Sequence, residues 1–134
     1  MHIIHHEQAM FYDTDAGGVI HNLAYLRMIE AARTRLAAKL GMGLREMAES
    51  GVFAVVCRTE IDYRRPGVLA DDLEIRGWLD EVGRARFWCR FEVFRPSDGC
   101  VLAAARQSLA LVKMPEGKPV RLPDGFGADL LAEG

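Results

Sequence analysis

The sequence predicts an α+β protein in which a curled antiparallel sheet of about five strands wraps around one long helix. Between residues 23 and 40, apolar residues recur three and four positions apart, a spacing typical of one face of an α-helix. After residue 51, apolar and polar residues alternate, a spacing typical of strands with one buried face. The order of strand, helix and four further strands leaves a single helix to cover one face of the sheet.

A turn separates the first strand from the helix. Residues 3 to about 11 mix apolar and polar side chains and are expected to form a short strand. Residues 12–22 are rich in turn-forming residues, and the helix after them has an apolar stripe made of Leu23, Leu26, Ile29, Ala32, Leu36 and Leu40. Asn22 would cap a helix of about 18 residues, and Gly41 or Gly43 would end it. The run at 43–51 is compatible with a short second helical piece.

Four strands are expected after residue 51. One face of the first would carry Phe53, Val55, Cys57, Thr59, Ile61 and Tyr63. The next two strands lie around residues 73–80 and 84–93, and P-S-D-G at 96–99 predicts a hairpin turn into a last strand from 100 to about 113. The Pro- and Gly-rich remainder is expected to run over the surface. Because such a chain has a limited core, a dimer that extends the sheet is also expected.

Length and composition restrict the class of protein. The 134 residues suit one domain spanning 1–134, and 50% hydrophobic residues are enough for a core. The formal charge of −2 gives no basic field for nucleic acid, and no apolar run is long enough for membrane insertion. The N-terminal residues do not match a signal peptide. Three dispersed cysteines without C-x-x-C spacing indicate reduced thiols and a cytoplasmic location.

The turn D-T-D-A-G-G at 13–18 is the first candidate site. Asp13 or Asp15 could act as a base or nucleophile, with the neighbouring carboxylate raising its pKa, although Asp is also a common turn residue. Gly17 and Gly18 permit close approach of a ligand oxygen to the unpaired N–H groups of the helix start, where an oxyanion would be stabilised. A tight turn without a ligand is the alternative, and the glycine spacing matches no nucleotide-binding motif.

Other polar residues have weaker patterns. His21 and Asn22 could donate hydrogen bonds to a substrate carbonyl, or Asn22 could serve only as the helix cap. The pairs Arg64–Arg65 and Arg84–Arg86 could bind phosphates, or could belong to a solvated or interface face. Glu30 is expected to be solvated and paired with a helix neighbour. No spacing fits a zinc site or a G-x-S-x-G serine hydrolase.

The run Y-D-T-D-A-G-G-V-I-H-N-L-A-Y-L at 12–26 resembles the hotdog-fold acyl-CoA thioesterases, in the branch of the 4-hydroxybenzoyl-CoA and Tol-Pal-associated thioesterases. The match to their D-x-D-x-x-G-x-V signature and following tyrosine rests on Asp13, Asp15, Gly18, Val19 and Tyr25. Weaker similarities follow in the right order: Y-x-x-P-x-x-x-x-D-x-L from residue 63, V-G-R-A-R-F at 82–87 and G-K-P-V-R-L-P at 117–123.

This resemblance implies a hotdog fold and hydrolysis of acyl-CoA or aryl-CoA thioesters, including 4-hydroxybenzoyl-CoA-like substrates. Asp15 would attack the carbonyl or activate a water, and the helix start around His21 and Asn22 would supply an N–H to the thioester oxygen. The other substrate-binding candidates would be Gly17, Gly18, Tyr25 and, for the CoA phosphates, Arg64, Arg65, Arg84 and Arg86. The protein would form a homodimer or homotetramer with sites between subunits. It would need no metal or redox cofactor, since coenzyme A is part of the substrate.

One departure, one disfavoured branch and two rivals accompany that resemblance. The Tol-Pal-associated branch usually has Tyr-His where this chain has His21-Asn22, so a side-chain role for His21 is not implied. A branch that uses a helix glutamate lacks the turn aspartate, and the presence of Asp15 therefore argues against a catalytic Glu30. A non-catalytic acyl-CoA-binding or scaffolding protein of the same fold would keep the pocket without the chemistry. A hydratase is the less favoured rival, because no D-x-x-x-x-H segment is present in the expected loop.

Overall fold

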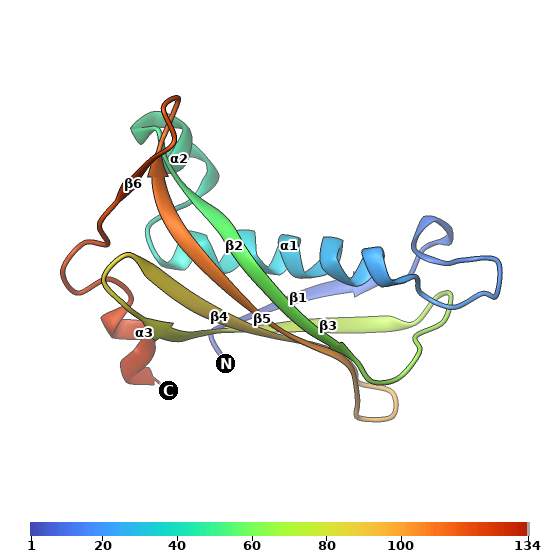
Figure 1. Ribbon diagram of the computed structural model, residues 1–134. Helices are drawn as coiled ribbons and strands as arrows, with labels where there is room; N and C mark the ends of the chain where they lie inside the picture. Colours follow the sequence, from blue (N-terminus) through green and yellow to red (C-terminus); the bar gives the residue numbers. More distant parts are fainter. Residues whose placement is uncertain (134) are drawn as a thin grey trace.

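The computed structural model describes residues 1–133, which form a six-stranded antiparallel sheet with three α-helices (Figure 1). The strands are β1 (Ile3–Gln8), β2 (Val52–Tyr63), β3 (Asp72–Val82), β4 (Arg86–Arg95), β5 (Cys100–Lys113) and β6 (Lys118–Val120). The helices are α1 (Asn22–Lys39), α2 (Leu44–Ser50) and α3 (Ala128–Glu133), and a 3₁₀ turn covers Phe11–Asp13. The sheet order is β1-β3-β4-β5-β2, with β6 paired to β5.

The predicted α+β class is confirmed, but the element count is not. The helix of about 18 residues is α1, and the short helical piece after it is α2. The stretch beyond residue 114 was expected only to run over the surface, and it contains β6 and α3, which the sequence pattern did not predict. Strand β6 pairs with Leu111–Lys113, beyond the point where β4 leaves β5 at Ala110. One helix alone does not cover the sheet, since α2 contacts β2 and α3 contacts β3.

Helix α1 supplies one wall of the core by packing against β1, β3 and β4 (Figure 1). The buried positions of its stripe are Ala24, Tyr25, Met28, Ile29, Ala32, Leu36 and Ala37. Leu23, which the spacing placed on this stripe, is 63% exposed because the buried face begins one residue later. Alternate residues of β3, β4 and β5 complete the core from the sheet side. This packing fixes the start of α1 above one end of the sheet.

The six residues expected to share one face of β2 are divided between two faces at the midpoint of the strand. The β2–β5 register shifts between Val56 and Arg58, so Cys57 forms a bulge. Residues opposite each other across a ladder share a face. Ala54 and Val56 lie opposite buried Leu111 and Leu109, whereas Thr59, Ile61 and Tyr63 lie opposite buried Gln107, Ala105 and Ala103. The helix-facing side therefore changes from even to odd residues at Cys57, which a strict alternation could not predict.

Strand β2 is poorly covered for a strand of its length. None of its residues is buried, and Val55, Val56 and Tyr63 are 37%, 39% and 47% exposed. One of its edges pairs with β5, and its other edge has no partner strand within residues 1–133. A long strand edge with exposed apolar side chains is a site where another strand can add.

Candidate functional site

The turn between β1 and α1 is folded against the loop between β2 and β3. Ala9 N donates to Asp71 O and Ala70 N donates to Ala9 O, both at 2.9 Å. Further along, Ile20 N donates to Gly67 O at 2.9 Å. These hydrogen bonds place the aspartate-glycine turn and the arginine-rich end of β2 in the same corner of the molecule, at the N-terminal end of α1.

Asp13 is the aspartate that holds this turn together. Its side chain is 1% exposed, with Oδ2 accepting from Met10 N at 2.9 Å and Oδ1 from Arg27 Nη2 at 3.0 Å. Arg27 also pairs with Glu7 on β1. Because the side chain is almost fully buried and each of its oxygens accepts from a donor of the protein, Asp13 has a structural role and is not presented to a ligand.

Replacing Asp13 with Ala is expected to lower the free energy of unfolding by about 2–3 kcal/mol, since hydrogen bonds to a buried carboxylate are lost. In this variant Arg27 still pairs with Glu7, so its guanidinium is not left without an acidic partner. Chemical denaturation at one fixed protein concentration measures the change. Asp98→Ala is the control, because Asp98 is an exposed turn residue that also pairs with an arginine. A smaller loss in Asp13→Ala than in this control would contradict the structural role.

Asp15 differs from Asp13 in having a carboxylate that reaches solvent. The residue is exposed, and Oδ1 accepts from Gly17 N at 2.8 Å. Its backbone N donates to Val19 O at 2.9 Å, and Gly18 closes the turn with a φ of +78° that suits glycine. Oδ2 has no hydrogen-bond donor within residues 1–133. The turn thus orients the carboxylate and leaves one oxygen available for chemistry.

Helix α1 begins one residue earlier than a cap at Asn22 would require. His21 is the N-cap, with Nδ1 accepting from Ala24 N at 3.1 Å and Nε2 lying 3.1 Å from Tyr12 O. Since Nδ1 accepts, Nε2 carries the proton and donates to Tyr12 O. Both ring nitrogens of His21 are therefore occupied by the protein. The expectation that Asn22 caps the helix was wrong, and its side chain is left exposed at the first helical position.

The first turn of α1 offers unpaired donors. The backbone N–H groups of Asn22 and Leu23 find no acceptor within residues 1–133, as is normal for the start of a helix. The partial positive charge of the helix N-terminus lies at the same place and favours a negatively charged oxygen. The sequence-based expectation of an anion-stabilising helix start therefore has a geometric basis, at the residues directly after the turn of Asp15.

Two tyrosines shape a cavity beside this helix start. Tyr25 is buried, and its hydroxyl accepts from Gly67 N at 3.1 Å; burial is the main cause that raises its pKa. Tyr63 donates to Asn22 O at 3.3 Å, with its ring centroid 5.7 Å from that of Tyr25. The cavity has a volume of about 300 Å³ and is lined by Ile20, Asn22, Tyr25, Tyr63, Arg64, Arg65 and Pro66. We call it the Tyr63 cavity.

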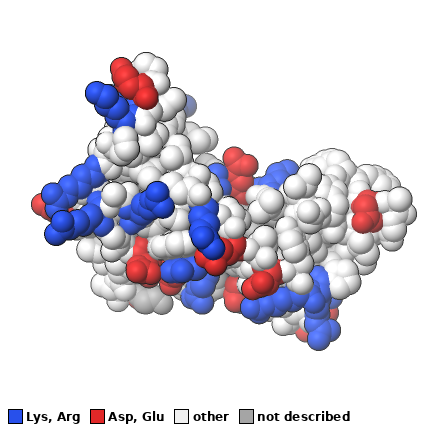
Figure 2. Space-filling model, viewed as in Figure 1, with Lys and Arg blue, Asp and Glu red and all other residues white. Residues whose placement is uncertain are grey.

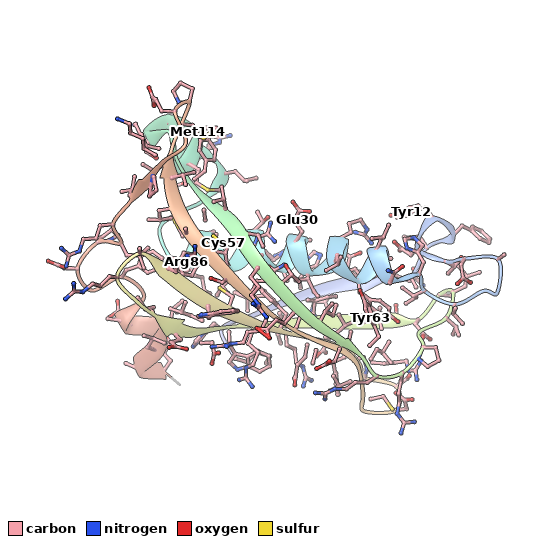
Figure 3. The ribbon with its side chains drawn as sticks, viewed as in Figure 1. Tyr12, Glu30, Cys57, Tyr63, Arg86 and Met114 are labelled. Carbon is pink, nitrogen blue, oxygen red and sulfur yellow. The ribbon has the colours of Figure 1, made fainter. Side chains whose placement is uncertain are left out.

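The four candidate arginines fall into two separate groups. Arg64 and Arg65 line the Tyr63 cavity, and their backbone N–H groups donate to Leu102 O. Arg84 and Arg86 lie at the turn between β3 and β4, and Figure 3 shows Arg86 and Tyr63 toward opposite ends of the sheet. Figure 2 shows basic side chains both at the end that carries β6 and near the loop after β2, interspersed with acids. None of the four guanidinium groups has an ion-pair partner within residues 1–133, so all remain available to an anion.

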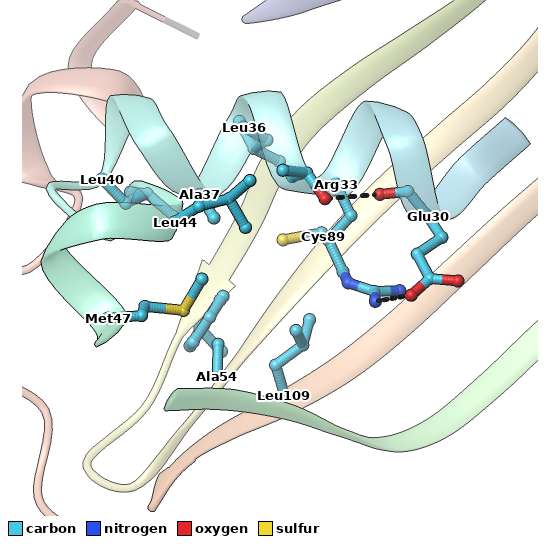
Figure 4. Close-up of a pocket in the computed structure, with 12 residues that line it drawn as sticks. Glu30, Arg33, Leu36, Ala37, Leu40, Leu44, Met47, Ala54, Cys89 and Leu109 are labelled. Atoms are coloured by element: carbon cyan, nitrogen blue, oxygen red, sulfur yellow. Dashed lines mark hydrogen bonds and ion pairs between the residues drawn. The ribbon is translucent and has the colours of Figure 1, made fainter. Parts of the chain in front are cut away.

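A second cavity lies between α1, α2 and the sheet (Figure 4). It has a volume of about 180 Å³, and its lining includes Arg33, Leu36, Met47, Ala54, Phe87 and Cys89. We call it the Arg33 cavity. Burial raises the pKa of the Cys89 thiol to about 12, so this cysteine is not a nucleophile at neutral pH. No pattern in the sequence predicted this cavity, because its walls come from several elements. Tyr63 was likewise expected only as a strand residue and as part of a family motif, not as a residue of the site.

The described residues hold neither a metal-binding cluster nor a membrane-spanning helix. Among residues 1–133, no cluster of three or more His, Cys, Asp or Glu side chains could hold a metal ion. Within the same range, no helix has the length and apolar character that crossing a membrane requires.

Comparisons with known proteins agree on one group. The family model of the thioesterase-like superfamily matches residues 10–130. The acyl-CoA thioesterase YbgC of Haemophilus influenzae is 32% identical over 84% of this chain and 82% of its own length. A 1,4-dihydroxy-2-naphthoyl-CoA hydrolase of Synechocystis is 26% identical over 87% of this chain and 85% of its own. The crystal structure of a hypothetical protein from Aquifex aeolicus superposes with a TM-score of 0.83 at 28% identity, covering 96% of this chain and 98% of that one.

Proposed function

Because this chain belongs to the thioesterase-like superfamily, we propose that it hydrolyses the thioester bond of acyl-CoA or aryl-CoA substrates and releases a free acid and CoA. Its relatives include an acyl-CoA thioesterase and an aryl-CoA hydrolase. The observation that carries the proposal is the available oxygen of Asp15 beside unpaired N–H groups at the start of α1. A carboxylate next to an oxyanion site is the arrangement that acyl transfer to water requires.

In this mechanism the thioester oxygen lies at the helix start and accepts from the backbone N–H of Asn22 or Leu23. The negative charge that develops on this oxygen is stabilised by those N–H groups and by the helix dipole. The free oxygen of Asp15 either attacks the carbonyl carbon, giving an anhydride that water cleaves, or removes a proton from an attacking water. The CoA thiolate leaves in both cases. Both routes use only side-chain carboxylate chemistry and invoke no cofactor.

His21 has an indirect part in this proposal. Its two nitrogens cap the helix and bind Tyr12 O, so it fixes the helix start and does not donate to the substrate. The exposed side chain of Asn22 lines the Tyr63 cavity and is the better donor to the substrate. The backbone N–H of Gly17 holds the Asp15 carboxylate in place, and a Cβ at this position would lie only 3.2 Å from Asp15 Oδ1. Tyr25 acts by holding the loop at Gly67 against the cavity.

The working form in this proposal is a dimer in which two copies of β2 pair along their free edges. Antiparallel pairing about the midpoint of β2 is self-complementary, as a two-fold interface requires. It places Tyr63 of one copy opposite Val52 of the other, and so brings the Tyr63 cavity of one copy close to the Arg33 cavity of the other. The pairing also covers the exposed apolar side chains of β2. Association of two such dimers into a tetramer is compatible with this interface.

The same pairing brings the two arginine groups together. Arg86, Ala110 and Val55 form one row across the sheet, eight residues from Tyr63 of the same chain, or about 26 Å along β2. In the dimer this row continues near residue 60 of the other copy, about 10 Å along the strand from its Tyr63. This row lies on the face of the sheet away from α1, so Arg84 and Arg86 approach the end of β2 that carries Arg64 and Arg65 of the other copy along the outer surface, and we assign the four arginines to the phosphates of CoA there.

Replacing Arg86 with Ala is expected to raise KM for acyl-CoA substrates by about 5- to 10-fold and to leave kcat nearly unchanged, because a phosphate contact is made equally in the ground and transition states. The effect should shrink at high ionic strength. Steady-state kinetics at two salt concentrations measures it. Arg45→Ala, on the exposed side of α2, is the control. A KM equal to that of this control would remove Arg86 from the substrate site.

Thiol release from a panel of short-chain, long-chain and aromatic acyl-CoA substrates tests the proposed function. We expect turnover of at least one class. The second candidate is a non-catalytic acyl-CoA-binding protein, which the unoccupied arginine side chains also suit. Tight binding of CoA esters without turnover of any panel member would favour it. The three free cysteines support a proposed cytoplasmic location.

A further inference from the structure

The Arg33 cavity has the size and lining of a pocket for a small ring. Its walls are mainly apolar, with Leu36, Met47, Ala54 and Phe87 among them (Figure 4). Its volume of about 180 Å³ is slightly larger than the roughly 150 Å³ cavity that binds benzene in an apolar protein interior. A single substituted ring or a short acyl chain fits this volume, and a long fatty acyl chain does not.

Two charged side chains, Glu30 and Arg33, line this cavity. Arg33 is the more buried of the two, and several of its N–H donors have no acceptor within residues 1–133. Arg33 is 21% exposed, and its Nη1 donates to Gln107 Oε1 at 3.1 Å. Gln107 is itself buried and donates to Thr59 Oγ1 at 3.2 Å, so the amide is held in a fixed orientation. A guanidinium has five N–H donors. Of these, one is well bonded, and the nearest carboxylate, Glu30, lies 3.6 Å away with its side chain 68% exposed.

This weak pairing leaves Arg33 ready for an oxygen acceptor. A cation removed from water is costly unless it is paired and hydrogen-bonded. Burial accordingly lowers the pKa of Arg33, against the smaller opposing effect of Glu30. A ligand oxygen at the cavity would complete the hydrogen bonding of the guanidinium. Gln107, buried behind it, would keep the donors in place.

We infer that the Arg33 cavity receives the acyl part of a substrate whose thioester lies at Asp15 of the partner subunit, and that Arg33 selects ring substrates with a hydroxyl group distal to the thioester. The inference rests on the proposed thioesterase function and its β2 dimer. Within one chain, Glu30 lies eight residues along α1 from Asn22, about 12 Å, and the cavity lies beyond it. Across the paired β2 strands, Ala54 in the cavity wall faces residue 61 of the other copy, two residues from its Tyr63.

The first test is the ratio of kcat/KM for 4-hydroxybenzoyl-CoA to kcat/KM for benzoyl-CoA. We expect the native enzyme to prefer the hydroxylated ester by about 10- to 100-fold, the value of a hydrogen bond to a charged group. Arg33→Met should bring this ratio near one, and Arg33→Lys should keep part of it. Arg35→Met is the matched control, because Arg35 lies on the same helix, is exposed and bonds His5. A ratio that Arg33→Met leaves unchanged would overturn the inference.

Filling the cavity is an independent test if Arg33 variants fold poorly. Ala54→Leu should lower kcat/KM for both aromatic esters at least tenfold relative to acetyl-CoA, which does not need the cavity. An equal effect on all three esters would contradict the acyl pocket. If the native protein turned over none of the esters, the proposed function itself would be contradicted. Failure of the acyl pocket is thus distinguishable from failure of the proposed function.

Subunit mixing tests whether the cavity serves the other chain. An Asp15→Asn chain co-expressed with an Arg33→Met chain gives a heterodimer with one intact Asp15. If Arg33 acts across the interface, that site uses the native Arg33 of the other chain, and the preference for 4-hydroxybenzoyl-CoA returns. If Arg33 acts within its own chain, the same site is served by the substituted side chain and the ratio stays near one, which would refute the shared arrangement.

Discussion

Asp15→Asn is expected to lower kcat/KM for acyl-CoA esters by about 10²- to 10⁴-fold with little change in the fold. Asparagine keeps an oxygen that can accept from Gly17 N, so the turn stays in place. The second oxygen, which no protein donor occupies, becomes an amide nitrogen. That nitrogen cannot accept a proton from water and cannot attack a carbonyl, so both routes open to Asp15 are lost.

Thiol release by the variant, the native protein and Asp98→Asn measures this effect. Asp98 is a matched control because it is also an exposed turn aspartate whose Oδ1 accepts a backbone N–H two residues ahead. Binding of free CoA should be equal in all three proteins, which separates chemistry from affinity. Turnover of Asp15→Asn at the native rate would eliminate Asp15 as base and nucleophile, whatever the substrate.

The fold was largely predictable wherever local periodicity matched packing. The three- and four-residue spacing of the apolar side chains predicted α1 because one face of that helix meets β1, β3 and β4. Its exception, Leu23, precedes the first buried contact of the helix. The bulge at Cys57 could not be predicted, because it depends on how β2 fits against β5 over the whole strand. Strand β6 was not predicted because Lys118–Val120 is short, contains Pro and pairs with a segment that β4 leaves free.

The separate roles of the residues in the site could not be predicted from the sequence. The spacing D-x-D placed two carboxylates in the turn, but only the fold separates them: Arg27 and Met10 N occupy Asp13, whereas Asp15 keeps a free oxygen. His21 caps the helix in place of Asn22, because its Nδ1 accepts from Ala24 N while its Nε2 also bonds Tyr12 O. No pattern in the sequence singled out Arg33, since its partner Gln107 lies 74 positions away in the sequence.

Placing a charge on the inner face of the β2 edge is expected to lower kcat/KM about as much as Asp15→Asn does, but by dissociating the proposed dimer and not by removing a catalytic group. Val56 is 39% exposed, lies beside the bulge at Cys57 and faces the same side as Ala54. In the proposed dimer this side chain is covered near the two-fold axis. Val56→Asp would bury a carboxylate there without a partner, at a cost of several kcal/mol per ion. Each dimer carries the substitution twice.

Because about 1.4 kcal/mol corresponds to a tenfold change in Kd, two such carboxylates should weaken the dimer by about 10⁴-fold or more. We expect Val56→Asp to sediment as a monomer at micromolar concentration and to lose at least 10²-fold in kcat/KM per chain, although its own Asp15, Asn22 and Tyr63 are intact. Raising the protein concentration should recover activity in proportion to the fraction of chains that are dimeric.

Leu131→Asp is the control, since Leu131 is 40% exposed on α3, away from β2. A fully active monomer would show that each chain holds a complete site, and a Val56→Asp protein that remains dimeric would place the interface elsewhere. Loss of activity that follows dissociation is the result that a site divided between two chains requires.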